Sequence, residues 1–134
     1  MTSHSTAFVD SNIVFDITGR DPTWYQWSIV ALASCEHLLI NPIVFAELCY
    51  LKSSSSEVEQ LLENLEISYH ETPKAALFLA AQAFKLYRRR GGNKTSPLPD
   101  FFIGAHAASE GIPIITRDKA RYQTYFPSVE LISP

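Results

Sequence analysis

The chain has 134 residues, of which 46% are apolar and 12% aromatic, and its 11 Lys and Arg against 14 Asp and Glu give a formal net charge of −3. This length and composition suit one globular domain, residues 1–134, and exclude a disordered or fibrous protein. The longest apolar run, Ala75 to Ala81, is too short for a membrane helix, and the first residues lack the basic start and apolar core of a secretory signal. We therefore expect a cytoplasmic protein with no membrane attachment and with reduced thiols at Cys35 and Cys49.

Strands and helices alternate along the chain. Five short runs rich in apolar and β-branched residues predict strands at Thr6–Asp10, His37–Ile40, Glu66–His70, Ile112–Thr116 and Val129–Ile132. Helix-starting signals lie between them at Asp21-Pro22, Asn41-Pro42, the serine run Ser53–Ser56, Pro73 and Asp100, and helix-ending glycines lie at Gly91-Gly92 and Gly111. This alternation predicts an α/β fold, with a doubly wound, mainly parallel sheet of four to five strands flanked by helices.

Acidic residues occupy the places where such a sheet gathers function. Asp10 and Asp118 lie at or just beyond the carboxyl ends of the first and fourth predicted strands, and Asp100 begins a helix. Ligands of doubly wound sheets bind outside the carboxyl ends of strands, where the strand order reverses, and the first and fourth strands are expected to be neighbours there. We therefore expect these three carboxylates to lie close together.

Glu47 is a fourth candidate, because apolar residues lie three and four positions away from it on both sides within Ile43–Tyr50. A carboxylate on an apolar helix face needs a partner, since burying an unpaired charge costs several kcal/mol or forces protonation. Each acid also has a simpler interpretation: Asp100 and Asp118 as helix caps, Asp10 as the start of an Asx turn, and Glu47 as the partner of a distant arginine.

Four converging carboxylates without as many cations would repel one another, so the combination favours a bound cation. Carboxylate oxygens are hard ligands that suit Mg²⁺ or Mn²⁺. Cys35-Glu36-His37 is a weak zinc candidate, since it has no matching second pair of ligands.

Four segments that contain these acids resemble the signature blocks of PIN-domain ribonucleases, and specifically of VapC-type toxins from bacterial toxin–antitoxin pairs. The segments are Phe8–Ile13, Phe45–Leu48, Leu98–Ala107 and Ile114–Asp118, and together with their spacing they extend the resemblance over nearly the whole chain. The resemblance implies a PIN-like three-layer sandwich and a Mg²⁺- or Mn²⁺-dependent endoribonuclease. It also implies an inhibitory cognate antitoxin, whose tail lies over helices near the active site, and a homodimer, because members of the family commonly dimerise.

The resemblance assigns the acidic metal site to Asp10, Glu47, Asp100 and Asp118, with Thr116 as a supporting hydroxyl. Asp10 and Asp100 are the strongest candidates for direct ligands, while Glu47 and Asp118 would complete the cage or orient water. Many relatives carry a further acid a few residues later. Here the residues after Asp118 are Lys119, Ala120, Arg121 and Tyr122, so the chain departs from the family pattern.

The net charge conceals an uneven distribution. Residues 1–71 carry a net charge of −8, residues 72–99 carry +6 with no acid, and residues 100–134 carry −1. The basic block contains the candidate RNA-binding residues, which are Lys85, Arg88, Arg89, Arg90 and Lys94, and it runs directly toward Asp100. Lys and Arg supply most of the sequence-independent affinity for nucleic acid. The simpler interpretation is that the arginines only favour a helix C-terminus.

Two alternatives to a metal-dependent nuclease are compatible with the sequence. One is a non-catalytic PIN-like module that binds RNA or protein. The other is an aspartate-based phosphotransfer or phosphatase domain with Asp10 as nucleophile, although that chemistry would favour a second aspartate where Asn12 stands.

Overall fold

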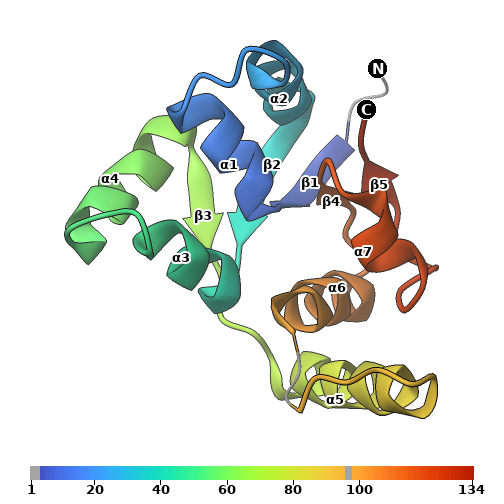
Figure 1. Ribbon diagram of the computed structural model, residues 1–134. Coiled ribbons are helices and arrows are strands. Elements are labelled where there is room, and N and C mark those ends of the chain that lie inside the picture. The colour runs from blue at the N-terminus through green and yellow to red at the C-terminus, as the bar shows by residue number, and fades with distance from the viewer. Residues whose placement is uncertain (1–3, 96–97) are drawn as a thin grey trace.

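The computed structural model describes residues 4–95 and 98–134, which form one α/β unit (Figure 1). The strands are β1 (His4–Val9), β2 (Cys35–Ile40), β3 (Ile67–Tyr69), β4 (Ile114–Ile115) and β5 (Leu131–Ile132). The helices are α1 (Ser11–Thr18), α2 (Tyr25–Ala33), α3 (Pro42–Cys49), α4 (Ser55–Leu65), α5 (Lys74–Arg89), α6 (Pro99–Glu110) and α7 (Lys119–Gln123). The two residues at 96–97, between the predicted RNA-binding loop and Asp100, lie outside the described residues.

The sheet has the order β3-β2-β1-β4-β5, and every neighbouring pair is parallel. The chain moves from β1 outward to β3, then crosses back to β4 on the other side of β1. Because crossovers between parallel strands are right-handed, α1 to α4 cover one face and α5 to α7 the other (Figure 1). The predicted three-layer, doubly wound fold is therefore confirmed, and the strand order reverses between β1 and β4.

The core consists of the central strands and the helix faces that pack on them. Phe8 and Val9 of β1 pair with Ile114 and Ile115 of β4, and all four side chains are fully buried or nearly so. Such an apolar run is expected for a strand covered by helices on both faces. No helix among the described residues has the length and apolar character that a membrane span requires.

The predicted strands are confirmed in place, although β3, β4 and β5 are shorter than expected. The predicted helix signals at Asn41-Pro42, the serine run, Pro73 and Gly111 lie at observed helix ends. Asp21 caps a turn rather than α2, because its carboxylate accepts hydrogen bonds from the backbone of Thr23 and Trp24, and α2 begins only at Tyr25.

The short helix α1 is not indicated by the sequence pattern. Its β-branched residues have modest helix propensity. The segment nevertheless forms a helix because it buries Ile13 and Val14 completely and because Asp10 caps it. Tertiary packing here outweighs local preference.

Candidate active site

Asp10 lies at the carboxyl end of β1, at the point where the strand order reverses, and its side chain is fully buried. Its Oδ1 accepts the N–H of Ser11 at 2.8 Å, so Asp10 is the N-cap of α1 rather than only an Asx-turn residue. Its Oδ2 accepts the hydroxyls of Thr116 and Tyr122, both at 2.8 Å. These three donors offset the cost of burying a carboxylate and fix its orientation.

Thr116 follows β4 and holds the neighbouring strand end in place. Its backbone N–H donates to the Ile132 carbonyl, and its hydroxyl, besides donating to Asp10, accepts the N–H of Asp118 at 3.1 Å. Thr116 is fully buried. The predicted supporting hydroxyl therefore links the two strand ends that carry Asp10 and Asp118.

Tyr122 is a residue of this site that the sequence pattern did not single out. It lies on α7, is fully buried, and donates its hydroxyl proton to Asp10. Burial, followed by the charge of Asp10, raises the pKa of Tyr122 far above its usual value, so the phenol remains a neutral donor.

Glu47 faces the same site from α3. Its Oε1 is buried and has no hydrogen-bond partner. Burial, together with the charges of Asp10 and Asp100, raises the pKa of Glu47, although the Ser11 hydroxyl and Arg121 oppose that rise. The interpretation of Glu47 as half of an arginine ion pair is not supported, because no ion pair to it is found among the described residues.

Asp100 and Asp118 share one cation, the guanidinium of Arg121 on α7. Arg121 Nη1 lies 3.3 Å from Asp100 Oδ1, and Arg121 Nε lies 2.9 Å from Asp118 Oδ2. Burial raises the pKa of Asp100, with Arg121 opposing this effect and Asp10 and Asp118 adding to it. Asp118 precedes α7, but its side chain makes no cap hydrogen bond, so its interpretation as a simple helix cap is not supported.

The four predicted carboxylates thus come from four different elements and face one region. Within residues 4–95 and 98–134, however, no three Asp, Glu, His or Cys side chains are grouped closely enough to hold a metal ion as they stand. The donor set still fits a hard divalent cation in chemistry and charge: four carboxylates face one arginine, and Glu47 Oε1 lacks any partner.

A second polar pair fixes the segment between β4 and α7. Arg117 donates two hydrogen bonds to the Asp16 carboxylate, at 2.6 and 2.9 Å, and its guanidinium lies 5.3 Å from the Trp24 ring centre. Asp16 is almost fully buried and also accepts the Ser28 hydroxyl. The pair joins α1 to the segment that carries Thr116 and Asp118. The sequence signal that could have indicated this pair is Asp16 itself, a buried aspartate in a segment that was not predicted to be a helix.

The predicted RNA-binding residues lie at the C-terminal end of α5 and in the loop after it. All five are exposed, namely Lys85, Arg88, Arg89, Arg90 and Lys94. Two of them have intramolecular roles: Arg88 donates to the Lys94 carbonyl at 2.7 Å, and Arg90 lies 5.6 Å from the Tyr125 ring centre. The basic segment is therefore ordered by its own contacts and leads toward α6, which carries Asp100.

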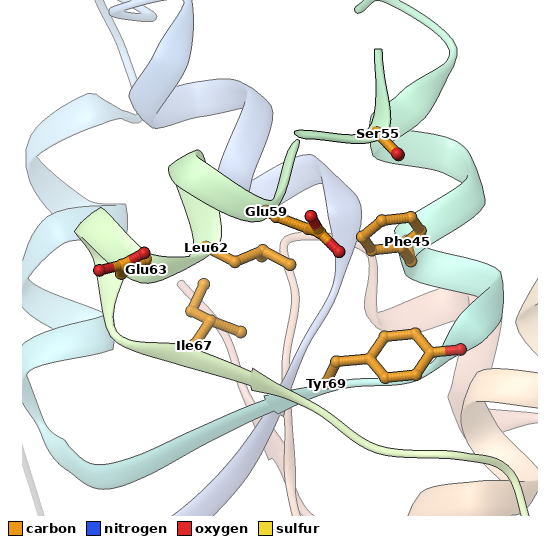
Figure 2. Close-up of a pocket in the computed structure, with 7 residues that line it drawn as sticks. All are labelled: Phe45, Ser55, Glu59, Leu62, Glu63, Ile67 and Tyr69. Carbon is orange, nitrogen blue, oxygen red and sulfur yellow. The ribbon is translucent and has the colours of Figure 1, made fainter. Parts of the chain in front are cut away.

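Two hollows are lined in part by residues of α3. One, of about 500 Å³, is enclosed by Phe45 and Tyr69 on one side and by Leu62 and Ile67 on the other, and contains none of the predicted site residues (Figure 2). The other, of about 640 Å³, borders Glu47 and is lined mainly by apolar residues, among them Phe15, Ile43, Tyr50 and Leu51. The second hollow connects an apolar surface directly to the acidic site.

Solved structures similar to this chain share its fold. VapBC-1 from nontypeable Haemophilus influenzae matches with a TM-score of 0.71 and 16% identity over 96% of this chain and 97% of the other. FitAcB from Neisseria gonorrhoeae matches with a TM-score of 0.67 and 20% identity over 96% and 97% of the two chains. VapBC2 from Rickettsia felis, bound to a DNA fragment from its promoter, matches with a TM-score of 0.68 and 16% identity over 96% and 98%.

No curated protein matched the chain. The family model for the PIN domain, in contrast, matches residues 7–127, a range that contains Asp10, Glu47, Asp100 and Asp118. The match therefore covers nearly all of the fold and every predicted acidic residue. On this basis the chain belongs to the PIN domain family.

Proposed function

We propose that this protein is a Mg²⁺- or Mn²⁺-dependent endoribonuclease that acts as the toxin of a toxin–antitoxin pair. The observation that carries the proposal is the approach of four carboxylates from separate elements to the point where the sheet reverses, with Glu47 Oε1 buried and unpartnered. Nuclease function is typical of PIN-domain toxins, and the solved structures similar to this chain include toxin–antitoxin complexes by their own description.

A divalent cation held by Asp10, Asp100, Glu47 and Asp118 would activate a water and offset the charge that develops on the phosphoryl oxygens. The chain's own residues prepare the place. Thr116 and Tyr122 fix the Asp10 carboxylate by donating to Oδ2, which leaves acceptor capacity on Oδ1 beyond the Ser11 bond. Glu47 adds an oxygen that no protein donor uses.

The basic end of α5 supports RNA as the substrate class. Its exposed cations come shortly before the helix that carries Asp100, and α5 packs against that helix, so we expect RNA bound to them to lie on the same part of the molecule as Asp100. Contacts of this type bind phosphates without reading the base sequence. These cations would also offset the repulsion between the acidic site and the negatively charged RNA backbone.

A phosphotransfer role for Asp10 is disfavoured by the residue two positions after it. The position two residues later, where such chemistry would use a second acid, is Asn12, which bridges to the segment after β4 through Thr116 and the N–H of Arg117 at 3.4 Å each. Asn12 therefore has a structural task instead.

The test is RNA cleavage by the purified protein with and without metal. We expect cleavage with Mg²⁺ or Mn²⁺, none in EDTA, and a loss of at least about 100-fold in Asp100→Asn, since one charge at the metal site is removed while the shape of the side chain is retained. Glu59→Gln is the matched control, because Glu59 is exposed on α4, away from the acidic site, and should cleave normally.

Circular dichroism should show that both variants fold like the parent chain. Undiminished cleavage in EDTA, or by Asp100→Asn, would refute the metal-dependent mechanism. RNA binding without cleavage under all metal conditions would instead support the non-catalytic alternative.

A further inference from the structure

Arg121 occupies a position inside the acidic site that needs explanation. Its guanidinium contacts Asp118 through Nε and Asp100 through Nη1, so one side chain bridges two of the four carboxylates. It comes from α7, directly beside Tyr122, whose hydroxyl donates to Asp10. No other cation forms an ion pair with these carboxylates among the described residues.

Three carboxylates act on the single guanidinium of Arg121. Asp10, Asp100 and Asp118 all favour its charged form, and together they raise the pKa of Arg121 although burial opposes the rise. The charge of Arg121 in turn opposes the rise in the pKa of Glu47 and of Asp100 that burial causes. It therefore compensates the mutual repulsion of the acids, as a bound metal ion would.

The bridge is also easily opened. Arg121 is 40% exposed and Asp118 is 44% exposed, and ion pairs in contact with solvent are weak. The contact to Asp100 is long, at 3.3 Å, and uses one nitrogen only. A flexible arginine in such a position can leave at little cost when a stronger cation arrives. This differs from Arg117, which is held by two short hydrogen bonds to the buried Asp16.

We infer that Arg121 is a built-in counter-ion that holds Asp100 and Asp118 in the metal-free protein and competes with the divalent cation for them. The inference rests on the proposed metal site. Metal binding then requires the guanidinium to move away, which lowers the affinity for the ion and makes the site respond to its concentration.

The test compares Mn²⁺ affinity by isothermal titration calorimetry at fixed ionic strength. Arg121→Gln removes the charge and should bind Mn²⁺ about tenfold more tightly, because a cation beside the site no longer opposes the incoming ion. Arg121→Lys keeps the charge and should stay within about twofold of the parent protein. Lys119→Gln is the matched control, because it removes the same charge from the same helix. Lys119 is exposed and forms no ion pair among the described residues, so the Mn²⁺ affinity of this variant should also stay within about twofold of that of the parent protein.

Unchanged or weaker Mn²⁺ binding by Arg121→Gln would overturn the inference, as would equal tightening by Lys119→Gln, which would indicate a general charge effect. If the parent protein binds Mn²⁺ and cleaves RNA but Arg121→Gln binds no more tightly, only this inference fails. If neither protein binds Mn²⁺, the inference fails together with the metal-dependent function.

A second measurement uses the parent chain and does not depend on a variant folding. The Nε–H signal of Arg121 in ¹⁵N NMR should report the ion pair to Asp118 in metal-free protein, and Mg²⁺ should shift it toward the position of a free arginine. The Arg117 signal should not move and serves as the internal control. An Arg121 signal that saturating Mg²⁺ leaves unchanged would show that the bridge persists and that no competition occurs.

Discussion

Glu47 lies in an environment that a carboxylate does not prefer. Its Oε1 is buried without a partner, and burial and neighbouring acids raise its pKa. A buried acceptor without a donor costs stability, and such costs are commonly retained at functional sites. The cation that would remove this cost is the one the proposed function requires.

The direction of the pKa shift predicts a pH-dependent stability difference. The pKa of Glu47 in the folded protein lies above its usual value of 4.5, so the stability associated with the neutral form is present below about pH 4.5 and is lost as the pH rises through the folded-state pKa. Glu47→Gln cannot ionise and escapes this loss. We expect it to raise the free energy of unfolding of the metal-free protein by roughly 0.5–2 kcal/mol at pH 7, with little difference at about pH 3.5.

Urea denaturation in EDTA at the two pH values measures this difference. Glu59→Gln, which replaces an exposed carboxylate on α4, is the control and should change the free energy of unfolding little at either pH. If Glu47→Gln proved less stable than the parent at pH 7, Glu47 would be structurally paired rather than strained.

At the scale of the elements, the middle of α5 and its C-terminal end have different roles. Its middle packs against α6, with Ala76, Ala80 and Ala83 buried, while its last turn carries Arg88 and Arg89 into solvent. Small residues at the contact allow the two helices to approach closely. The cations at its C-terminal end therefore stay in solvent and take no part in the packing against α6.

Replacing Arg88, Arg89 and Arg90 with Ala should weaken RNA binding and flatten its salt dependence. Each phosphate that the variant no longer neutralises should reduce the slope of log K against log salt by about 0.7 for a single strand. Arg89→Ala alone breaks no intramolecular side-chain bond seen among the described residues and should weaken binding less, whereas Arg88 also holds the loop at Lys94. Fluorescence anisotropy with labelled RNA at several salt concentrations measures both quantities.

Lys74→Ala provides the control on the same helix. Lys74 is exposed and lies 14 residues before Arg88, which corresponds to about 21 Å along the helix axis. If Lys74→Ala reduced the affinity and the slope as much as the triple variant, the effect would be one of net charge. If the triple variant bound RNA normally, the arginines would be only a helix end.

At the scale of the whole molecule, the acidic site borders an apolar hollow, because Glu47 belongs to both. Tyr50 is 87% exposed and Leu51 is 69% exposed at the rim of the hollow that also contains Glu47. Large apolar side chains with such exposure commonly mark protein–protein contacts. An antitoxin segment bound there would cover the site from the side of α3, as the proposed toxin role requires.

Replacing Tyr50 and Leu51 with Asp should release the antitoxin while preserving RNA cleavage, because neither side chain belongs to the acidic site. Tagged chains with and without these substitutions are expressed in the source organism, and the proteins that co-purify with them are identified by mass spectrometry. Both chains also carry Asp100→Asn, so that a released toxin does no harm. Phe78→Asp, which changes an exposed aromatic residue on α5, is the control and should retain the partner.

The co-purified protein must also inhibit RNA cleavage by the active parent chain. Retention of that inhibitor by the Tyr50 and Leu51 variant would place its binding surface elsewhere. Normal release combined with loss of RNA cleavage in the active background would mean that the two residues also support the acidic site.

The sequence by itself determined the order of the strands and of most helices and the parallel sheet, and it predicted four acidic residues as the candidate site. These features depend on local periodicity and on helix-capping residues, which act over a few positions. The places of Asp10 and Thr116 at the ends of adjacent strands follow from the same pattern. Within α1, by contrast, local propensity was misleading because burial of Ile13 and Val14 decided the conformation.

Only the tertiary structure decided which side chains partner the acids. Tyr122 reaches Asp10 across 112 positions of the chain, and Arg117 reaches Asp16 across 101. Arg121 is likewise an ordinary surface residue in the sequence and becomes the cation of the acidic site only when α7 packs beside α6. Contacts between such distant residues depend on the packing of whole elements, which periodicity along the chain does not encode.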